Sequence, residues 1–129
     1  MNIPLEIKVI EKFVTKNKQS RYIQFVSSKK ARIKFIKDLP HFNHFKWELF
    51  EEVNGDDSDI LGRIQLLKGN KTTCYIISEN PDIDQQKMDI SEALQYISED
   101  RAIILVFGDA EMIYFGGEQP KNSFLSKIN

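Results

Sequence analysis

Apolar residues recur at helical spacing in the N-terminal part of the chain. Over residues 4–16 they return every three or four positions, which predicts an amphipathic helix. A second stripe over residues 20–39 predicts another helix, with apolar side chains, Ile33 among them, mainly on one side and lysines on the other. This helix ends before Pro40, because the residue before a proline avoids the α conformation, and the serine pair at 27–28 can divide it. The two segments predict a helical hairpin with one basic side.

After Pro40 the pattern changes to short strands separated by helices. Strands are expected over residues 46–53, 72–78, 102–107 and 111–115, with a short edge strand or a surface segment over 123–128. Helices are expected over residues 57–68 and 89–98, and residues 79–87 are predicted to form an acidic connection. The almost continuous apolar run at 102–107 is typical of a strand that is covered on both faces.

The order of these elements predicts an α/β fold, with α+β as the alternative. Two β-α-β units follow one another in residues 46–107, and such crossover units favour parallel strands. The turn at 108–110 is too short for a crossover, so the last two strands must form an antiparallel hairpin. We expect a single domain over residues 1–129, in which a mixed sheet (46–129) carries the basic helical hairpin (1–45).

Length and composition are those of a globular protein without a membrane segment. The chain has 129 residues, of which 41% are hydrophobic and 29% are charged, enough to bury a core. No signal-peptide pattern occurs at the N-terminus, and no stretch approaches the ~18 apolar residues of a membrane span. The single cysteine, Cys74, has no partner for an internal disulfide. We therefore expect a cytoplasmic protein.

Charge is distributed unevenly along the chain. Residues 1–47 hold 11 Lys and Arg against 3 Asp and Glu, a formal charge of +8. Residues 48–129 hold the remaining 7 against 16, a formal charge of −9, so the net charge of −1 conceals two halves of opposite sign. This asymmetry indicates either an anionic partner for the basic half or two halves that attract each other.

The first candidate binding site is the basic side of the second predicted helix. Its members are Lys29, Lys30, Arg32, Lys34 and Lys37. Such a cluster can bind nucleic acid through charge attraction and counterion release, or it can bind an acidic protein. Aromatic residues nearby could stack on bases if they were exposed, namely Tyr22, Phe42, Phe45 and Trp47. Two other interpretations stay open: a solvated helix face, and a surface that docks on the acidic half of the chain.

Carboxylates that follow the predicted strands form a second candidate site. They are Glu79, Asp82, Asp84 and Asp109. Because the carboxyl ends of parallel strands share one edge of a sheet, these side chains would lie close together. Clustered carboxylates can hold Mg²⁺ or Mn²⁺, and the ion can position a phosphodiester for hydrolysis. The alternative is that these acids only solubilise loops and stabilise turns.

His41 and His44 form a third candidate, three positions apart. Two histidines are an incomplete zinc site, since zinc takes three or four protein ligands. Cys74 lies in the middle of a predicted strand, where a packed thiol is expected. The chain contains no phosphate-binding loop, nucleophile elbow or zinc-protease motif. The sequence therefore predicts no catalytic residue and no cofactor.

Two stretches of the chain carry a pattern known from elsewhere. One covers residues 21–42, and the other combines Cys74-Tyr75-Ile76-Ile77-Ser78 and the residues to Asp84 with Met88, Ala93-Leu94 and Tyr114-Phe115-Gly116-Gly117-Glu118. Together they resemble a group of small, uncharacterised bacterial proteins. The chain departs from that group where Gly108-Asp109 follows the strand, since a Cys-Ile-Pro-Gly type of turn is expected there. The resemblance implies a bacterial, cytosolic protein and names no activity.

The separation of charge and the lack of a complete catalytic set lead to one main hypothesis. It is a non-catalytic binding or regulatory module that uses the basic helical side, with nucleic acid or an acidic protein as its partner and no role at a membrane. The first alternative is a carboxylate metal-dependent phosphodiester hydrolase. The second is an interaction protein of the immunity or antitoxin type, whose acidic half masks a basic partner. The sequence leaves the oligomeric state open, although residues 112–115 could offer an edge for strand pairing.

Overall fold

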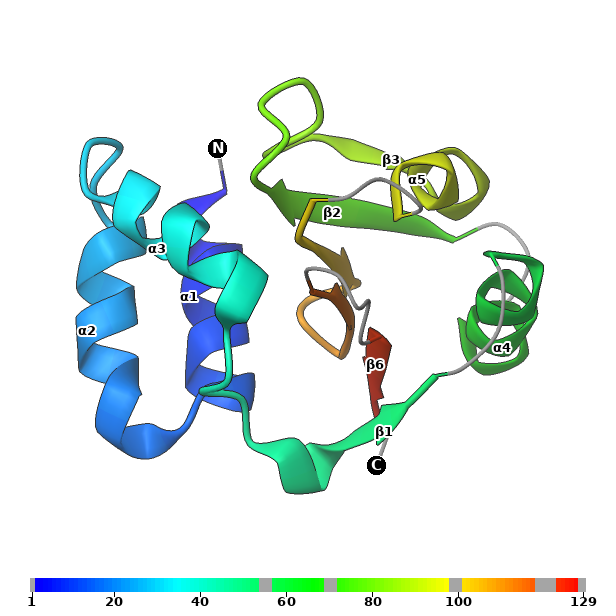
Figure 1. Ribbon diagram of the computed structural model, residues 1–129, viewed down its shortest axis with the longest axis horizontal. Helices are drawn as coiled ribbons and strands as arrows, with labels where there is room; N and C mark the ends of the chain where they lie inside the picture. Colours follow the sequence, from blue (N-terminus) through cyan, green and yellow to red (C-terminus); the bar gives the residue numbers. More distant parts are fainter. Residues whose placement is uncertain (1, 54–56, 69–71, 98–100, 118–122, 128–129) are drawn as a thin grey trace.

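Helices cover both faces of a central β-sheet (Figure 1). The computed structural model describes residues 2–53, 57–68, 72–97, 101–117 and 123–127. The helices in these ranges are α1 (Ile3–Phe13), α2 (Lys16–Val26), α3 (Arg32–Asp38), α4 (Asp57–Lys68) and α5 (Ile90–Ile97). The strands are β1 (Phe50–Glu52), β2 (Thr73–Ser78), β3 (Lys87–Asp89), β4 (Ile103–Phe107), β5 (Met112–Gly116) and β6 (Ser123–Ser126). The 3-10 turns η1 (Leu39–His41) and η2 (Trp47–Leu49) lie between α3 and β1. The predicted mixed α/β class is confirmed.

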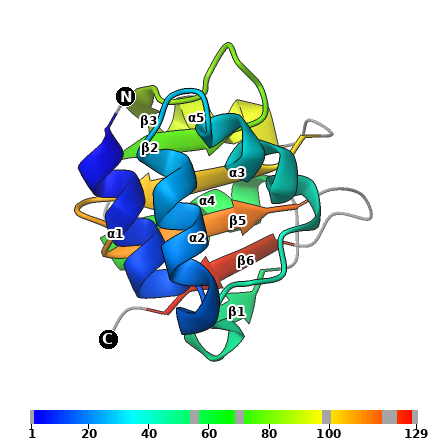
Figure 2. The same cartoon turned by 90° about the vertical axis from the view of Figure 1, so that its left-hand side faces the viewer.

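The N-terminal helices α1, α2 and α3 form one layer, which faces the viewer in Figure 2. α1 begins where the sequence predicts, because the Asn2 side chain accepts the N–H of Leu5 at 3.1 Å and Pro4 occupies the first turn. The second predicted helix is divided into α2 and α3. The division falls at the serine pair, where the Ser27 hydroxyl donates to the carbonyl of Ile23 at 2.6 Å.

The strands follow the order β1-β6-β5-β4-β2-β3, and all five neighbouring pairs in the described part of the chain are antiparallel. The parallel pairing that the crossover units favoured is therefore wrong. The reason is β3, which the sequence pattern missed between the predicted acidic connection (79–87) and the predicted helix (89–98). β3 pairs antiparallel with β2 and so reverses the direction of the chain. β4, which follows α5, therefore pairs antiparallel with β2 on its other side. The strands on either side of α4, β1 and β2, are separated in the sheet by three others.

The C-terminal hairpin is confirmed. β4 and β5 pair antiparallel through a tight turn in which Gly108 has φ +60°. β6 is not an edge strand as expected, because it lies between β5 and β1. β5 therefore has neighbours on both sides, and the prediction that residues 112–115 offer a free edge is wrong.

Alternate residues of each strand pack against different helix layers. On one face, Ile77, Ile104, Val106 and Phe115 pack with the apolar stripe of α1 and with α2 and α3. On the other face, Ile76, Leu105, Phe107 and Tyr114 pack with α4 and α5. This two-sided burial explains why residues 103–107 read as a continuous apolar run. Within the described residues, no helix combines the length and the apolar character needed to cross a membrane.

Candidate functional site

Cationic side chains gather on the outer surface of α2, α3 and the loop that joins them. Between Glu11 and Asp38 the sequence holds no acidic residue. The exposed lysines of this region include Lys29 and Lys30 in the α2–α3 loop and Lys34 and Lys37 on α3. We call these four residues the basic helical surface. It belongs to the layer that faces the viewer in Figure 2, and all four residues are exposed.

In the part of the chain that the structure describes, no ion pair joins the basic helical surface to the acidic half. The ion pairs among the described residues join Lys8 to Asp109, Arg32 to Glu6 and Asp84, and Arg63 to Glu51. None of them includes a lysine of the basic helical surface. Lys34 instead lies over the ring of Phe25, with its Nζ 5.6 Å from the ring centroid. The hypothesis that these lysines dock on the chain's own carboxylates therefore finds no contact in the described residues.

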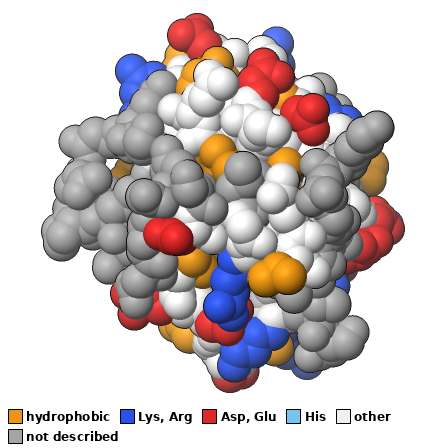
Figure 3. Space-filling view, turned by 90° about the vertical axis from the view of Figure 1, so that its right-hand side faces the viewer, with side chains coloured by type: hydrophobic (Ala, Val, Ile, Leu, Met, Phe, Trp, Pro, Cys, Tyr) orange, Lys and Arg blue, Asp and Glu red, His pale blue; other side chains and the backbone are white. Residues whose placement is uncertain are grey.

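On the opposite side of the molecule the charges are arranged differently. Figure 3 shows this face, with acidic side chains at several separate places and a small group of basic ones beside acidic ones. Arg63 of α4 and Glu51 of β1 form one such mixed pair. Among the described residues, Arg63 on this face is thus paired with a carboxylate, whereas none of the four lysines of the basic helical surface is.

Arg32 was predicted on the exposed basic side, and the structure places it in the interior. Only 4% of the residue is exposed. Its Nε and Nη2 donate to the two carboxylate oxygens of Glu6 at 2.8 and 2.9 Å, and Nη2 also donates to Asp84 at 3.0 Å. Burial alone would lower the pKa of Arg32, but the hydrogen bonds and charges of Asp84 and Glu6 raise it above the ordinary value. Arg32 is a structural cation and not part of the binding surface.

The Arg32 pair belongs to a larger buried network. Glu6 is fully buried, and the Tyr75 hydroxyl donates to its Oε2 at 2.6 Å. Burial and this hydrogen bond raise the pKa of Tyr75. The Asp84 carboxylate also accepts the backbone N–H of Ser78 at 3.0 Å. The network therefore ties α1, α3, β2 and the segment after β2 to one another.

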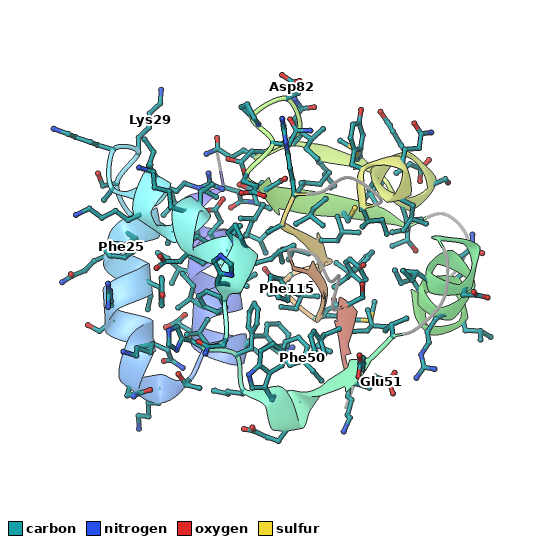
Figure 4. All side chains as sticks on the ribbon, in the orientation of Figure 1. Phe25, Lys29, Phe50, Glu51, Asp82 and Phe115 are labelled. Atoms are coloured by element: carbon teal, nitrogen blue, oxygen red, sulfur yellow. The ribbon has the colours of Figure 1, made fainter. Side chains whose placement is uncertain are left out.

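A groove of about 480 Å³ lies between α3 and the segment that joins β2 to β3. One wall carries Lys29, Ile33 and Lys37, and the other carries Glu79 and Pro81. The Arg32–Asp84 pair also lines the groove and joins the two walls. Figure 4 shows Lys29 and Asp82 projecting at the same edge of the molecule, from the two loops that flank this region.

Ile33 is the feature of the groove that the sequence pattern did not reveal. Helical periodicity assigned it to the apolar side, yet 56% of it is exposed. Its neighbours Lys29 and Lys37 line the same groove. The signal that could have located it is local, because Ile33 stands between Arg32 and Lys34 in the most basic stretch of the chain.

The four carboxylates of the predicted metal site are not brought together. Glu79 and Asp84 share the groove, but Glu79 accepts the backbone N–H of Ala102 at 2.9 Å and Asp84 binds Arg32. Asp109 pairs with Lys8 at the other end of β2, because antiparallel β4 places Phe107 opposite Cys74. Asp82 is exposed. No group of three or more His, Cys, Asp or Glu among the described residues is arranged to hold a metal ion, so the site expected from a parallel sheet does not form.

The aromatic residues near the basic stretch pack against other rings and are not available for stacking on bases. Tyr22, Phe42 and Phe45 are at most 5% exposed. Tyr22 and Phe42 stack edge to face with each other and with Phe35. In Figure 4 Phe50 and Phe115 likewise point into the space between the helices and the sheet. Trp47 is 36% exposed but lies against Phe124, away from α3. A base-stacking platform beside the basic helical surface is therefore not formed by these residues.

Cys74 is a packed thiol, as its position in a strand predicted. It is 1% exposed, and its Sγ lies 3.6 Å from the carbonyl oxygen of Met88. Burial, together with the charge of Asp89, raises its pKa to about 12. A thiol in this state is a poor nucleophile and a poor metal ligand.

His41 and His44 line one pocket together with Arg21 and Lys37. The sequence suggested these histidines as a partial zinc site, and in the structure two cations line the pocket with them, beside Tyr22, Asp38 and Phe42. The chain matches no protein-family model, no curated protein and no solved structure in the comparisons made.

Proposed function

We propose that this chain is a non-catalytic binding module that binds an acidic protein partner through the basic helical surface and the groove beside it. The observation that carries the proposal is the exposed Ile33 between Lys29 and Lys37, with none of the four lysines paired to a carboxylate in the described part of the chain. The location proposed is the bacterial cytosol, which the resemblance and the single buried cysteine support.

The arrangement favours a protein over a nucleic acid. Protein interfaces combine a central apolar contact with a polar, charged rim, and Ile33 with its surrounding lysines has this composition. A nucleic acid would use the lysines, but it would leave the exposed isoleucine without a partner. The aromatic rings that could stack on bases are buried.

The groove explains how such a partner would be held. Lysines attract the carboxylates of the partner over distances of about 10 Å at moderate salt and accelerate its association. An apolar side chain of the partner would then enter the groove between Ile33 and Pro81, where the removal of apolar surface from water supplies affinity. The Arg32–Asp84 pair holds the two walls at a fixed separation.

The test uses two synthetic peptides, one of glutamate and glycine and one in which leucine replaces a central glycine. We expect the leucine peptide to bind more tightly, and we expect Ile33→Ser to remove most of that difference. Leu66→Ser is the matched control, because Leu66 is 88% exposed on α4, at the opposite face. Fluorescence anisotropy of the labelled peptides measures the affinity of each peptide for the native chain and for the two variants.

Charge is tested separately with Lys29→Glu/Lys30→Glu. This double variant should weaken both peptides by about tenfold or more, because attraction becomes repulsion. Lys16→Glu/Lys18→Glu changes the same number of charges at the other end of α2 and should have a much smaller effect. The proposal is wrong if single-stranded DNA or heparin binds more tightly than the leucine peptide and Ile33→Ser leaves every affinity unchanged.

A further inference from the structure

A second pocket, of about 300 Å³, lies where α2, α3 and η1 meet. Arg21 of α2 and Lys37 of α3 line it, together with His41 and His44 and with the Tyr22–Asp38 pair. These residues come from four separate positions along the chain. The fold therefore brings two permanent cations and two imidazoles to one small, polar cavity.

The walls of this pocket are held in place by packing. The backbone N–H of Thr15 donates to the carbonyl of His44 at 2.7 Å, which fixes the histidine segment against the start of α2. The ring of Phe42 is buried, and its centroid lies 5.5 Å from that of the His44 imidazole. The centroid of the Tyr22 ring lies 6.1 Å from that of the same imidazole. The side chains are thus presented from a rigid support and not from a free loop.

The charge balance of the pocket favours an anion. Asp38 is the one carboxylate that lines it, and its Oδ2 accepts the Tyr22 hydroxyl at 2.9 Å. Burial and this hydrogen bond raise the pKa of Tyr22 to about 12, so the phenol stays neutral. Arg21 and Lys37 form no ion pair with a carboxylate among the described residues. With the histidines counted as neutral, the lining carries a formal +1, from two cations and one carboxylate.

A metal ion is the poorer occupant. His41, His44 and Asp38 are not among any group of three or more ligating side chains placed to hold a metal, within the described residues. The neighbouring guanidinium and ammonium groups would repel a cation. Both groups are donors only, and a guanidinium fits the oxygens of a phosphate by two parallel hydrogen bonds.

We infer that the pocket lined by Arg21, Lys37, His41 and His44 is a binding site for a phosphate monoester group of a small molecule. Arg21 and Lys37 supply the permanent charge, and His41 and His44 complete the polar lining beside them. The site is separate from the peptide-binding proposal, and Lys37 alone borders both.

The first experiment titrates the full chain with phenyl phosphate and follows the ring resonances of the two histidines by NMR. We expect saturable shifts, with chloride at equal ionic strength giving none. Arg21→Gln should weaken binding by about tenfold. Asp38→Asn keeps an acceptor for Tyr22 but removes the negative charge, so it should strengthen binding. Lys30→Gln, which loses the same charge outside the pocket, should change nothing.

The second experiment repeats the titration with sulfate, a dianion that also carries tetrahedral oxygens. Sulfate should compete with phenyl phosphate for the pocket. His44→Gln, which alters one wall of the pocket, should weaken the binding of both anions. Unsaturable shifts, or equal losses for Arg21→Gln and Lys30→Gln, would overturn the inference. Peptide binding by Arg21→Gln remains normal whichever result is found, so this test is independent of the proposed function.

Discussion

At the scale of single residues, Arg32 shows how far a side chain can depart from its sequence context. It stands among exposed lysines, yet it is buried and bonded to Glu6 and Asp84. Sequence reasoning could not identify this, because Glu6 and Asp84 are 26 and 52 positions away. The sequence does offer one hint. Position 32 carries an arginine in a stretch that is otherwise rich in lysine, and the planar, forked guanidinium can donate to two carboxylates in a way that lysine cannot.

Removing this guanidinium should cost much of the protein's stability. Arg32→Met leaves two carboxylates without their cation, one of them fully buried, and such a change lowers the free energy of unfolding by about 3–5 kcal/mol. Urea denaturation followed by circular dichroism gives the value. Lys34→Met, two positions along α3 and exposed, should stay within about 0.5 kcal/mol of the native chain. A loss below about 1 kcal/mol for Arg32→Met would show that the network is not a source of stability.

The Cys74 thiol makes stability depend on alkaline pH. Its folded pKa of about 12 lies above the ordinary thiol value of 9.0. For a folded pKa that is raised, the stabilising contribution is complete below the unfolded value and is lost as pH rises through the folded one. The free energy of unfolding should therefore fall between about pH 9 and pH 12. Cys74→Ala should flatten the decline between pH 8.5 and pH 10, and an unchanged slope would contradict this assignment.

At the scale of elements, the helices and the apolar strands were predictable and the small polar strand was not. α1 and α5 follow from periodicity because each buries one face, and β4 follows from its continuous apolar run because it is buried on both faces. Lys87-Met88-Asp89 has neither a long run nor an apolar alternation, and it becomes β3 only by pairing with β2. That one omission led to the wrong strand directions and hence to the wrong carboxylate site.

Two glycines should respond in opposite directions to the same substitution. Gly108 has φ +60°, where an L-residue is strained, so Gly108→Ala should destabilise by about 1–2 kcal/mol. Gly62 lies inside α4 with nothing within 4 Å of an added Cβ, so Gly62→Ala should stabilise by up to about 1 kcal/mol. Thermal unfolding of both variants measures the two effects. Changes of the same sign would show that backbone conformation is not what distinguishes the two positions.

At the scale of the whole molecule, the uneven charge along the sequence corresponds to a basic surface on the folded protein. The four lysines of the basic helical surface lie on one layer, and the acids are spread over loops, strand ends and the other face (Figure 3). The sequence indicated the excess of charge but could not separate its exposed members from Arg32. Nor could it place Ile33 or gather Arg21 and the two histidines into one pocket, since these depend on how the helices pack.

This arrangement predicts weak self-association that salt abolishes. The net charge is only −1, so little overall repulsion keeps copies apart, and the basic helical surface of one copy can contact acids of another. Analytical ultracentrifugation should show a concentration-dependent increase in sedimentation at 20 mM NaCl and none at 300 mM. Lys29→Glu/Lys30→Glu should remove the increase. Association that persists at high salt would indicate an apolar interface instead.

The way in which α3 is anchored determines which of its positions tolerate substitution. Arg32 and Phe35 hold the helix on the body of the molecule, while Ile33, Lys34 and Lys37 take little part in that anchoring. Mutations at the outward positions therefore escape the stability threshold that restrains most substitutions. Such a helix can acquire a new partner while the scaffold stays intact, so descendants of this chain would be expected to diverge first at positions 33, 34 and 37.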